Sequence, residues 1–381
     1  MLDLNDSPVD LTLKMIRFRT ISPEDCGLQK EIGRYLQAAG FQVRHLDFGK
    51  VFNLYATYGT GSPNICLVGH TDVVPPGDEK KWSTPPFEGK IVENRVVGRG
   101  ACDMKGGVAC QMVAAKQFVE KRGKNFKGKI SLVITGNEET STEEGALSLL
   151  EQLQKEGEKI DYALVGEPTN PKELGEVVKQ GRRGIIHGDV VIQGKQGHVA
   201  YPHLAKNPLH WTLTSLERIV GFDLDGGKPR EGFPPSNLQI TDLRMGAGAY
   251  NVIPGELSFK FAIRYNPACH FEKVEREFHQ ILQSVGLPYK MGIRNEATPF
   301  FSESSKMKAV LKEVIKKGTG REPEFNTEGG TSDGRFFAQF GIPVMEFGLA
   351  GGSLHQVDEW ARIADIEKLT QIYEDFLAAW S

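Results

Sequence analysis

The chain has 381 residues, of which 39% are hydrophobic and 25% are charged, and its formal net charge at pH 7 is -3. This length exceeds what one hydrophobic core usually serves, so two domains are expected. The small net charge carries no polybasic signature, which argues against nucleic acid or an anionic membrane as a partner. The acidic N-terminal segment lacks the apolar run of an export signal, and no stretch approaches the ~20 apolar residues of a membrane span, so a cytoplasmic protein is expected.

Helices and strands are expected to alternate along most of the chain. Apolar residues recur with helical spacing in the segments 9–19, 27–39, 106–120 and 143–155. Short apolar runs that end at polar or glycine-bearing loops are typical of buried strands, and they occur at 65–68, 132–134, 162–165 and 343–347. This alternation predicts an α/β sheet with helices on both faces. In such sheets, functional residues lie just beyond the carboxyl ends of the strands.

The middle of the chain has a different pattern. The segments 185–193 and 257–264 alternate apolar and polar residues as half-buried antiparallel strands do, and helical patterns occur at 206–220 and 270–285. We expect a four-stranded α+β domain at residues 183–298, inserted into an α/β domain formed by residues 1–182 and 299–381.

The first candidate for chemistry is the segment Gly69-His70-Thr71-Asp72, which follows a predicted strand. On extended backbone, residues i and i+2 point the same way, so Asp72 can lie beside His70. A carboxylate on one ring nitrogen would fix the tautomer and leave the other nitrogen free for a metal. A surface histidine near a helix cap is the alternative.

A second candidate is Asp103, which four glycines surround in the segment 98–107 before a helical pattern. Glycine permits close approach of other groups, so the two oxygens of this carboxylate could bridge two metal ions. The alternative is an ordinary helix N-cap.

Further acids and a histidine also follow predicted strands. Glu138 and Glu139 are adjacent after a buried run, and they repel each other unless a cation lies nearby. One of them could bind metal while the other transfers a proton, although the start of a solvated helix would explain the pair equally well. With Glu167 and His355 they complete a set of oxygen and imidazole ligands that suits zinc, with cobalt or manganese as substitutes.

Five segments in this order resemble the motifs of the M20 family of dinuclear zinc peptidases and deacylases. They are GHTDVVPPGD, GRGACDMKGG, the Glu138–Glu139 pair, LVGEPT and GGSLHQVDE, and the resemblance extends over about residues 9 to 378. It implies a zinc-exopeptidase-like catalytic domain built on a mixed sheet, with an inserted lid and dimerisation domain.

The resemblance also implies roles for individual residues. Two Zn2+ ions per subunit would be bridged by Asp103, and Co2+ or Mn2+ could substitute for them. The remaining metal ligands would be His70 and Glu167 on one ion, and Glu139 and His355 on the other. Asp72 would support His70, and Glu138 would be the general base.

Within the family, the resemblance is closest to the branch that hydrolyses N-succinyl-L,L-2,6-diaminopimelate, with acetylornithine or another N-acyl amino acid as the alternative substrate. It rests on the segments 174–184, 197–203, 251–256 and 329–333. Arg182 offers a planar fork for a substrate carboxylate, although a solvated arginine pair is the alternative. In the implied homodimer, His198 would reach the partner subunit's site and polarise the scissile carbonyl; the alternative is a core histidine beside Tyr201. The other expected substrate contacts are Tyr201, Asn251, Arg264 and Thr331.

Overall fold

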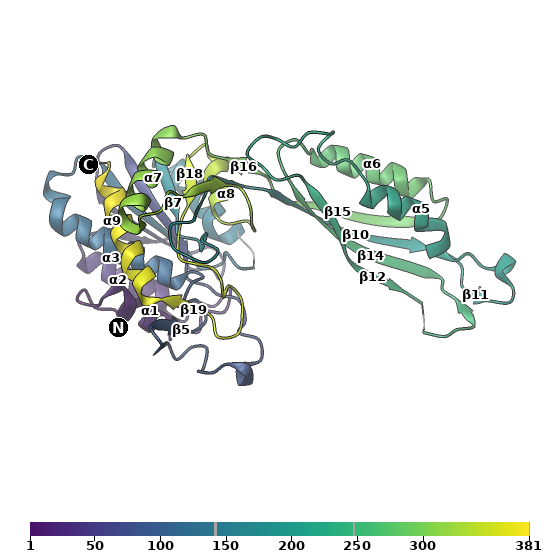
Figure 1. Cartoon of the computed structure of the whole chain (residues 1–381), viewed down its shortest axis with the longest axis horizontal. Helices are drawn as coiled ribbons and strands as arrows, with labels where there is room; N and C mark the ends of the chain where they lie inside the picture. The colour runs from purple at the N-terminus through teal and green to yellow at the C-terminus, as the bar shows by residue number, and fades with distance from the viewer. Residues whose placement is uncertain (141–142, 247, 381) are drawn as a thin grey trace. The chain divides into compact units, whose positions relative to one another are not determined.

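The computed structural model describes residues 1–140, 143–246 and 248–380, and the chain divides into two compact units. Unit 1 comprises Met1–Gly181, Phe301–Asn326 and Ser332–Ser381, and unit 2 comprises Arg182–Phe300 and Thr327–Thr331. Each unit has its own cluster of buried apolar side chains, so each is held together by a separate hydrophobic core. Figure 1 shows the helices and strands of the whole chain.

Unit 1 is built on a mixed sheet in which the structure describes eight strands. In spatial order they are β1 (Gln42–His45), β2 (Leu54–Gly59), β6 (Lys129–Thr135), β3 (Asn64–His70), β7 (Tyr162–Val165), β18 (Val344–Glu346), β8 (Val177–Lys179) and β17 (Glu324–Asn326). Strands β6, β3, β7 and β18 are mutually parallel, whereas β2 pairs antiparallel with β6. All seven residues of β3 are buried, as expected for a central parallel strand.

The parallel strands end at one level of the sheet. His70 is paired with Thr135 at the end of β6, and Val68 is paired with Val165 at the end of β7. Val165 is also paired with Glu346, the last residue of β18. The loops that follow these strands therefore leave the sheet together, along the edge where the sequence predicts functional residues.

Helices pack around this sheet, which confirms the predicted α/β class. They are α1 (Pro8–Ile16), α2 (Leu28–Ala38), α3 (Lys105–Arg122), α4 (Ser148–Lys155), α7 (Ser305–Thr319), α8 (Gly334–Gln339) and α9 (Ile363–Ala378). Helix α3 contacts α1, α9 and β3, and most of its residues from Lys105 to Ala115 are buried because neighbours enclose it on several sides. A small antiparallel sheet of β4 (Lys90–Val92), β5 (Arg95–Val97) and β19 (Trp360–Arg362) completes this unit.

Helix α1 is shorter than the predicted segment 9–19, because it ends at Ile16. Beyond it, the Oγ of Thr20 donates a hydrogen bond to the carbonyl oxygen of Thr71 at 2.6 Å, and the N–H of Val73 donates to the carbonyl of Thr20. The chain thus leaves the helix to run beside the loop that follows His70.

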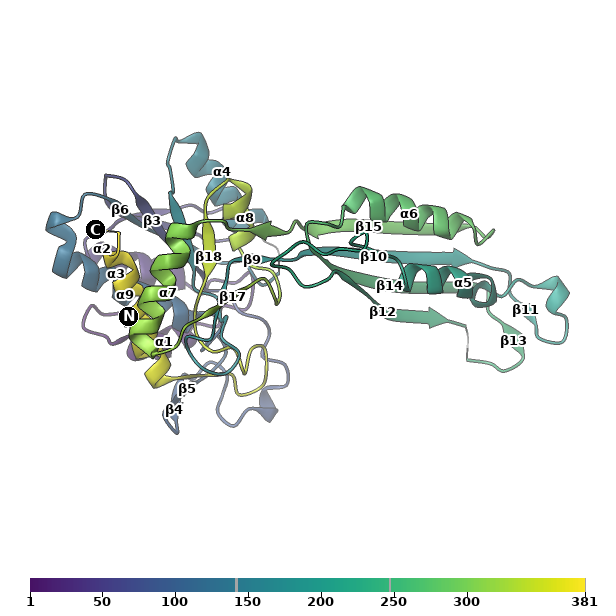
Figure 2. The same cartoon turned by 45° about the horizontal axis from the view of Figure 1, so that its top comes forward.

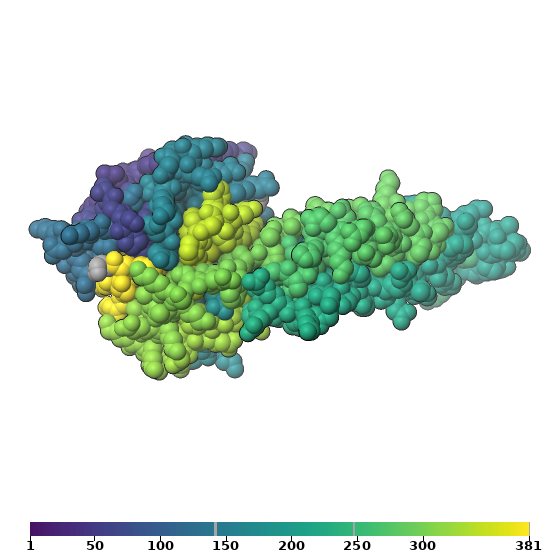
Figure 3. All heavy atoms as spheres, turned by 90° about the horizontal axis from the view of Figure 1, so that it is seen from above, coloured from purple at the N-terminus to yellow at the C-terminus, as the bar shows by residue number. Residues whose placement is uncertain are grey.

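Unit 2 contains an antiparallel sheet of four described strands covered by two helices. The strands in order are β12 (Asn237–Met245), β14 (Glu256–Tyr265), β10 (Gly184–Gln193) and β15 (Tyr289–Ala297), and the helices are α5 (Pro208–Val220) and α6 (Phe271–Gln283). The two helices contact each other and lie on one face of the sheet (Figures 1 and 2), and Figure 3 shows their side chains from above. A short pair, β11 (Gly197–His198) and β13 (Val252–Ile253), extends this unit.

None of the described helices of either unit has both the length and the apolar character needed to cross a bilayer.

Candidate functional site

His70 is the last residue of β3, and its ring is almost completely buried. Its Nδ1 lies 2.9 Å from the backbone carbonyl of Asp72 and 3.5 Å from the Asp72 carboxylate. A carbonyl can only accept, so Nδ1 carries a proton, and Nε2 faces the carboxylates, where it can bind a metal ion once it carries no proton of its own. The sequence suggested the Asp72 carboxylate for this task, but the shorter contact comes from the main chain. The burial excludes the alternative of a surface histidine.

Asp103 lies between the two predicted metal-ligating histidines. Its Oδ1 is 3.2 Å from Nε2 of His70, and its Oδ2 is 3.0 Å from Nε2 of His355. The helix that follows has Met104 at its N-cap position, and no side chain caps it. The alternative interpretation of Asp103 as a helix N-cap is therefore wrong. Each oxygen of its carboxylate faces a different imidazole.

Glu167 stands two residues beyond β7, beside His70. Its Oε1 is buried, lies 3.5 Å from Nε2 of His70 and accepts no hydrogen bond from any described residue. The backbone around it is closely packed: a Cβ atom at Gly107 would lie 2.8 Å from the carbonyl oxygen of Gly166, and one at Gly348 would lie closer still. Glycine at these two positions lets the strand end carrying Glu167 fit between neighbouring segments.

The Glu138–Glu139 pair is held by Asp72. The two carboxylate oxygens of Asp72 accept the backbone N–H groups of Glu138 and Glu139, both at 3.0 Å. On the other side, Oε1 of Glu139 lies 3.2 Å from Nε2 of His355. Asp72 thus joins the loop after β3 to the loop after β6, and the next described helical turn begins only at Glu143.

These side chains form two groups that have the donor set of a metal site. In each group the ligand atoms lie within 4.8 Å of one another, and the groups are His70, Glu138, Glu167 and His70, Asp103, Glu139. Carboxylates outnumber imidazoles, and no described residue donates a hydrogen bond to the buried Oε1 of Glu167. Both observations fit a site for divalent cations, because oxygen and imidazole ligands suit zinc-class ions.

Burial and the closely spaced carboxylates together shift the pKa values of the cluster. Burial alone would lower the pKa of His70, but hydrogen bonds to Asp103 and Asp72 raise it well above its usual value. Hydrogen bonds to Asp103 and Glu139 raise the pKa of His355 to about 10. Burial, followed by the charge of Asp103, raises the pKa of Glu167 to about 7. The cluster favours positive charge in its centre, and a bound cation would supply that charge while both imidazoles stay neutral.

Burial raises the pKa of Glu138 well above its usual value, and the negative charge of Glu167 adds to the effect. A general base works best when its pKa lies near the operating pH, so this environment suits a carboxylate that accepts and returns a proton.

Two further acids belong to the site but had no role in the sequence analysis. Glu359 is fully buried and accepts hydrogen bonds from the backbone of Asp103 and its neighbours. Asp333 is also buried and accepts a hydrogen bond at 2.8 Å from the Oγ of Thr135, the last residue of β6. Both acids lie in segments that carry the family resemblance, which are GGSLHQVDE and residues 329–333. Their residue type alone does not distinguish them from acids exposed to solvent.

The predicted substrate contacts lie in unit 2, whereas the predicted metal ligands, Asp72 and Glu138 lie in unit 1. Those in unit 2 are Arg182, His198, Tyr201, Asn251, Arg264 and Thr331. Arg182 is buried and donates a hydrogen bond to the carbonyl of Glu328 at 2.9 Å, so it is not a solvated arginine. His198 is exposed, which excludes the core-histidine alternative, and its ring lies 5.8 Å from that of Tyr201.

Arg264 and its neighbour Arg183 each have a buried guanidinium nitrogen without a partner among the described residues: Nη1 in Arg264 and Nε in Arg183. Burial lowers the pKa of Arg264, and the positive charge of Arg183 lowers it further. Two like charges with unsatisfied buried donors are costly unless an anion pairs with them.

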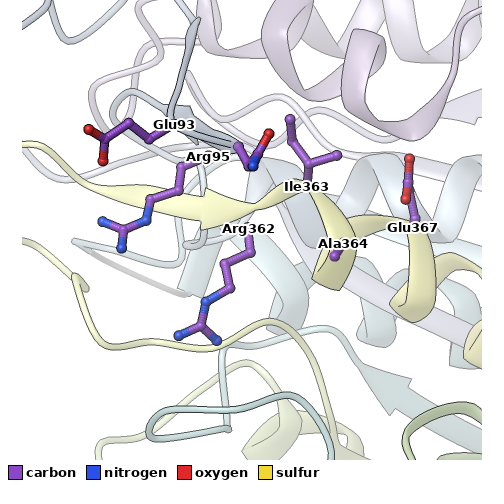
Figure 4. Close-up of a pocket in the computed structure, with 7 residues that line it drawn as sticks. Glu93, Arg95, Arg362, Ile363, Ala364 and Glu367 are labelled. Atoms are coloured by element: carbon purple, nitrogen blue, oxygen red, sulfur yellow. The ribbon is translucent and has the colours of Figure 1, made fainter.

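Unit 1 has a surface pocket of about 460 Å³ (Figure 4). It is lined by Glu93, Asn94, Arg95, Arg362, Ile363, Ala364 and Glu367. Arg362 already pairs with Glu173 at 3.3 Å and with Asp365 at 3.5 Å, and the pocket contains none of the predicted site residues.

The mixed sheet and its cluster of histidines and carboxylates define a metal-dependent hydrolase. The chain belongs to peptidase family M20/M25/M40, whose model matches residues 66–379.

Several solved structures, M20 peptidases among them, have the same fold. An M20 family metallo-carboxypeptidase from Sulfolobus solfataricus is 18% identical, with a TM-score of 0.82 over 98% of this chain and 99% of that one. A tripeptidase from Staphylococcus aureus is 18% identical, with a TM-score of 0.75 over 100% and 99% of the two chains. A dinuclear metal-binding M20 peptidase from Bacillus subtilis is 16% identical, with a TM-score of 0.66 over 98% and 96%.

Proposed function

We propose that the protein is a cytoplasmic dinuclear zinc amidohydrolase that cleaves N-succinyl-L,L-2,6-diaminopimelate to succinate and L,L-2,6-diaminopimelate. The reaction would serve lysine and diaminopimelate biosynthesis. The observation that carries the hydrolase part is the position of Asp103, whose two oxygens face His70 and His355 at 3.2 and 3.0 Å. Acetylornithine deacetylation, or hydrolysis of another N-acyl amino acid, is the alternative.

In this proposal Asp103 would be shared by two ions, and each ion would also be held by one more carboxylate and one imidazole. His70 and Glu167 would hold the first ion, and Glu139 and His355 the second, because these pairs lie 3.5 and 3.2 Å apart. Two zinc-class ions would supply Lewis acidity for the amide carbonyl and a more acidic water. Co2+ or Mn2+ would serve in place of Zn2+.

Glu138 is the proposed general base. It takes a proton from the attacking water and delivers it to the leaving nitrogen, so the amide bond breaks as the carboxylate of succinate and the amine form. Its main chain is anchored on Asp72, which keeps the side chain beside His70 and Glu167. A proton-transfer group held in this way contributes about 10²–10⁴-fold to the rate.

His198 is the proposed donor to the amide carbonyl. Its Nδ1 accepts the backbone N–H of Ala200 at 3.1 Å, so the neutral ring carries its proton on Nε2. An N–H in that position can donate to the oxygen on which negative charge develops.

The succinyl preference is supported by Arg264 and Arg183. Their partnerless buried nitrogens offer charge-assisted hydrogen bonds to a carboxylate at the far end of the acyl group. An acetyl group has no such carboxylate and would leave these donors unpaired, which is how a polar site rejects a shorter analogue. Arg182, Tyr201, Asn251 and Thr331 are the remaining proposed substrate contacts.

Unit 2 is also the proposed lid and dimerisation domain. Strand β12 is an edge strand of its sheet and exposes Leu243 and Met245, while α5, which contacts β12, exposes Trp211, Leu213 and Val220. An edge strand flanked by exposed apolar side chains needs to be covered, and two-fold pairing of identical chains is the commonest way to do so.

The test is a side-by-side assay of the zinc-loaded protein on N-succinyl-L,L-2,6-diaminopimelate and N-acetylornithine. We expect a kcat/KM ratio that favours the succinyl substrate, loss of activity after chelation and its return with Zn2+. Arg264→Leu should lower kcat/KM for the succinyl substrate without lowering that for the acetyl one. A preference for N-acetylornithine would identify the alternative, and full activity of metal-free protein would contradict the hydrolase mechanism.

A further inference from the structure

Glu359 is a buried carboxylate whose hydrogen bonds converge from the segment that carries Asp103. Its Oε1 accepts the backbone N–H groups of Cys102 and Asp103 at 3.0 and 3.1 Å. Its Oε2 accepts the N–H of Gly100 at 3.1 Å and Nη1 of Arg99 at 2.6 Å. The side chain is fully buried, so no water competes for these bonds.

The same carboxylate is tied to the loop of His355, which lies four residues earlier in the chain. This loop is closed on itself, because the Oγ of Ser353 accepts the N–H of Trp360 at 3.0 Å and donates to its carbonyl at 3.1 Å. Glu359 lies inside this closed loop, so its position relative to His355 is restricted. The guanidinium of Arg99 also lies 3.4 Å from the carbonyl of His355.

Asp103 and His355 are 252 residues apart in sequence, yet their side chains must be held about 3 Å apart. The hydrogen bonds of Glu359 directly connect the loop that carries Asp103 with the loop that carries His355. We propose that Glu359 is a positioning residue that sets the distance between Asp103 and His355 and thereby determines how tightly the ion between them is bound. This inference deepens the proposed function and rests on its metal site.

Glu359→Gln is the informative change because it keeps the size of the side chain and removes one acceptor oxygen. The amide NH2 must then face either the N–H groups of Cys102 and Asp103 or those of Gly100 and Arg99. On the side that the amide NH2 faces, its N–H groups would point at other N–H groups. These buried donors would then have no acceptor, and that loop would be held less firmly. Changes to groups that orient metal ligands typically weaken metal affinity by about 10–100-fold.

The experiment titrates metal-free protein with Zn2+ by calorimetry and records the visible absorption of the Co2+ form. Wild-type protein should bind two ions, and Glu359→Gln should bind at least one of them about 10–100-fold more weakly. The Co2+ spectrum should change, and kcat should fall at limiting Zn2+ but recover in part when Zn2+ is raised.

Glu374→Gln is the matched control. Glu374 is also a buried acid of unit 1 with a cationic partner, Lys121 at 2.8 Å, and its carboxylate has no hydrogen bond or ion pair with a site residue in the part of the chain that the structure describes. This variant should lose stability and bind both ions as wild-type protein does.

If Glu359→Gln loses stability but keeps wild-type Zn2+ affinity and Co2+ spectrum, its role is structural and the proposal is overturned. If it does not fold, Glu359→Asp, which keeps the charge on a shorter side chain, takes its place, and unchanged Zn2+ affinity in that variant overturns the proposal equally. A wild-type chain that binds no ion would contradict the proposed function itself, a result distinct from an unaffected variant of a two-ion protein.

Discussion

At the scale of single residues, Glu138 and Glu139 are neighbours with different surroundings, which supports the different tasks proposed for them. Glu139 approaches His355 at 3.2 Å, whereas Glu138 groups with His70 and Glu167 and has a raised pKa. A carboxylate that binds metal is held by the ion, and one that transfers protons must be able to take up a proton. The difference between the two neighbours therefore follows from position and not from residue type.

Glu138→Gln should retain the fold and both metal ions but lose most turnover, because an amide cannot accept a proton from water. The expected loss in kcat is about 10²–10⁴-fold or more. Steady-state kinetics and metal analysis of the same preparation measure both properties.

Glu143→Gln, at an exposed acid of the following segment, is the control and should stay active. Glu139→Ala should instead lower the metal content. Near-normal turnover in Glu138→Gln would exclude Glu138 as the base.

Sequence reasoning reached some residues of the site and missed others for a physical reason. His70, Glu139 and Glu167 follow buried strands, and parallel strands bring their carboxyl ends together, so their gathering at one edge could be predicted. Glu359 and Asp333 act through loops and contact groups more than a hundred residues away. No local spacing encodes such contacts, so only the fold reveals them. The catalytic and ligand roles themselves stay predictions.

At the scale of elements, helix α1 shows how local sequence fixes a boundary. The Oγ of Ser7 accepts the N–H of Asp10 at 3.1 Å, and the Asp10 carboxylate accepts the N–H of Ser7 at 3.1 Å. This reciprocal capping satisfies two donors at the helix start, with Pro8 in the first turn. Because α1 packs on α3, which begins two residues after Asp103, the cap also stabilises the support of the site.

Asp10→Asn should lower the free energy of unfolding at pH 7 by about 0.5–1 kcal/mol. Hydrogen bonds from Ser7 lower the pKa of Asp10 below its usual 3.8, so the folded state holds this proton less tightly than the unfolded state. The stabilisation is therefore fully present above pH 3.8 and is lost as the pH falls through the lower folded value.

Urea unfolding of wild type and Asp10→Asn at pH 7 and near pH 3 tests this, with the exposed Glu24→Gln as control. The difference between wild type and Asp10→Asn should shrink on acidification. A difference that grew towards low pH would contradict the capping argument.

Long buried strands and amphipathic helices could be predicted because burial imposes a period on the sequence, as for β3, β6, β10 and β14. The predicted segments did not include the short strands β1, β8 and β17, nor the longer strands β12 and β15 and the helices α7 and α9. The three short strands show too few alternations for a period. The equally short β7 and β18 could be recognised because their apolar runs end at polar or glycine-bearing loops.

At the scale of the whole molecule, the proposed homodimer predicts that two inactive variants can restore activity when they form a mixed dimer. His198→Ala and Glu138→Gln should each be inactive alone, but a mixed dimer has one site in which both residues are intact if His198 serves the partner's site. After full exchange, half of the dimers are mixed and each has one such site, so activity should return to about a quarter of wild type.

Co-purification of differently tagged variants shows whether the chains have exchanged, and the activity is measured on the mixture before this separation. Wild type mixed with its own tagged form controls for losses during exchange. Proven exchange without recovered activity would place His198 outside the partner's site.

The glycines that enclose Glu167 also restrict how this molecule can evolve. A Cβ atom at Gly107 or Gly348 would lie less than 3 Å from the carbonyl oxygen of Gly166, so even one added methyl group would displace the backbone that carries Glu167. The smallest substitution at either position therefore already disturbs the geometry of the site. Mutations that preserve this geometry must occur at other positions of the chain.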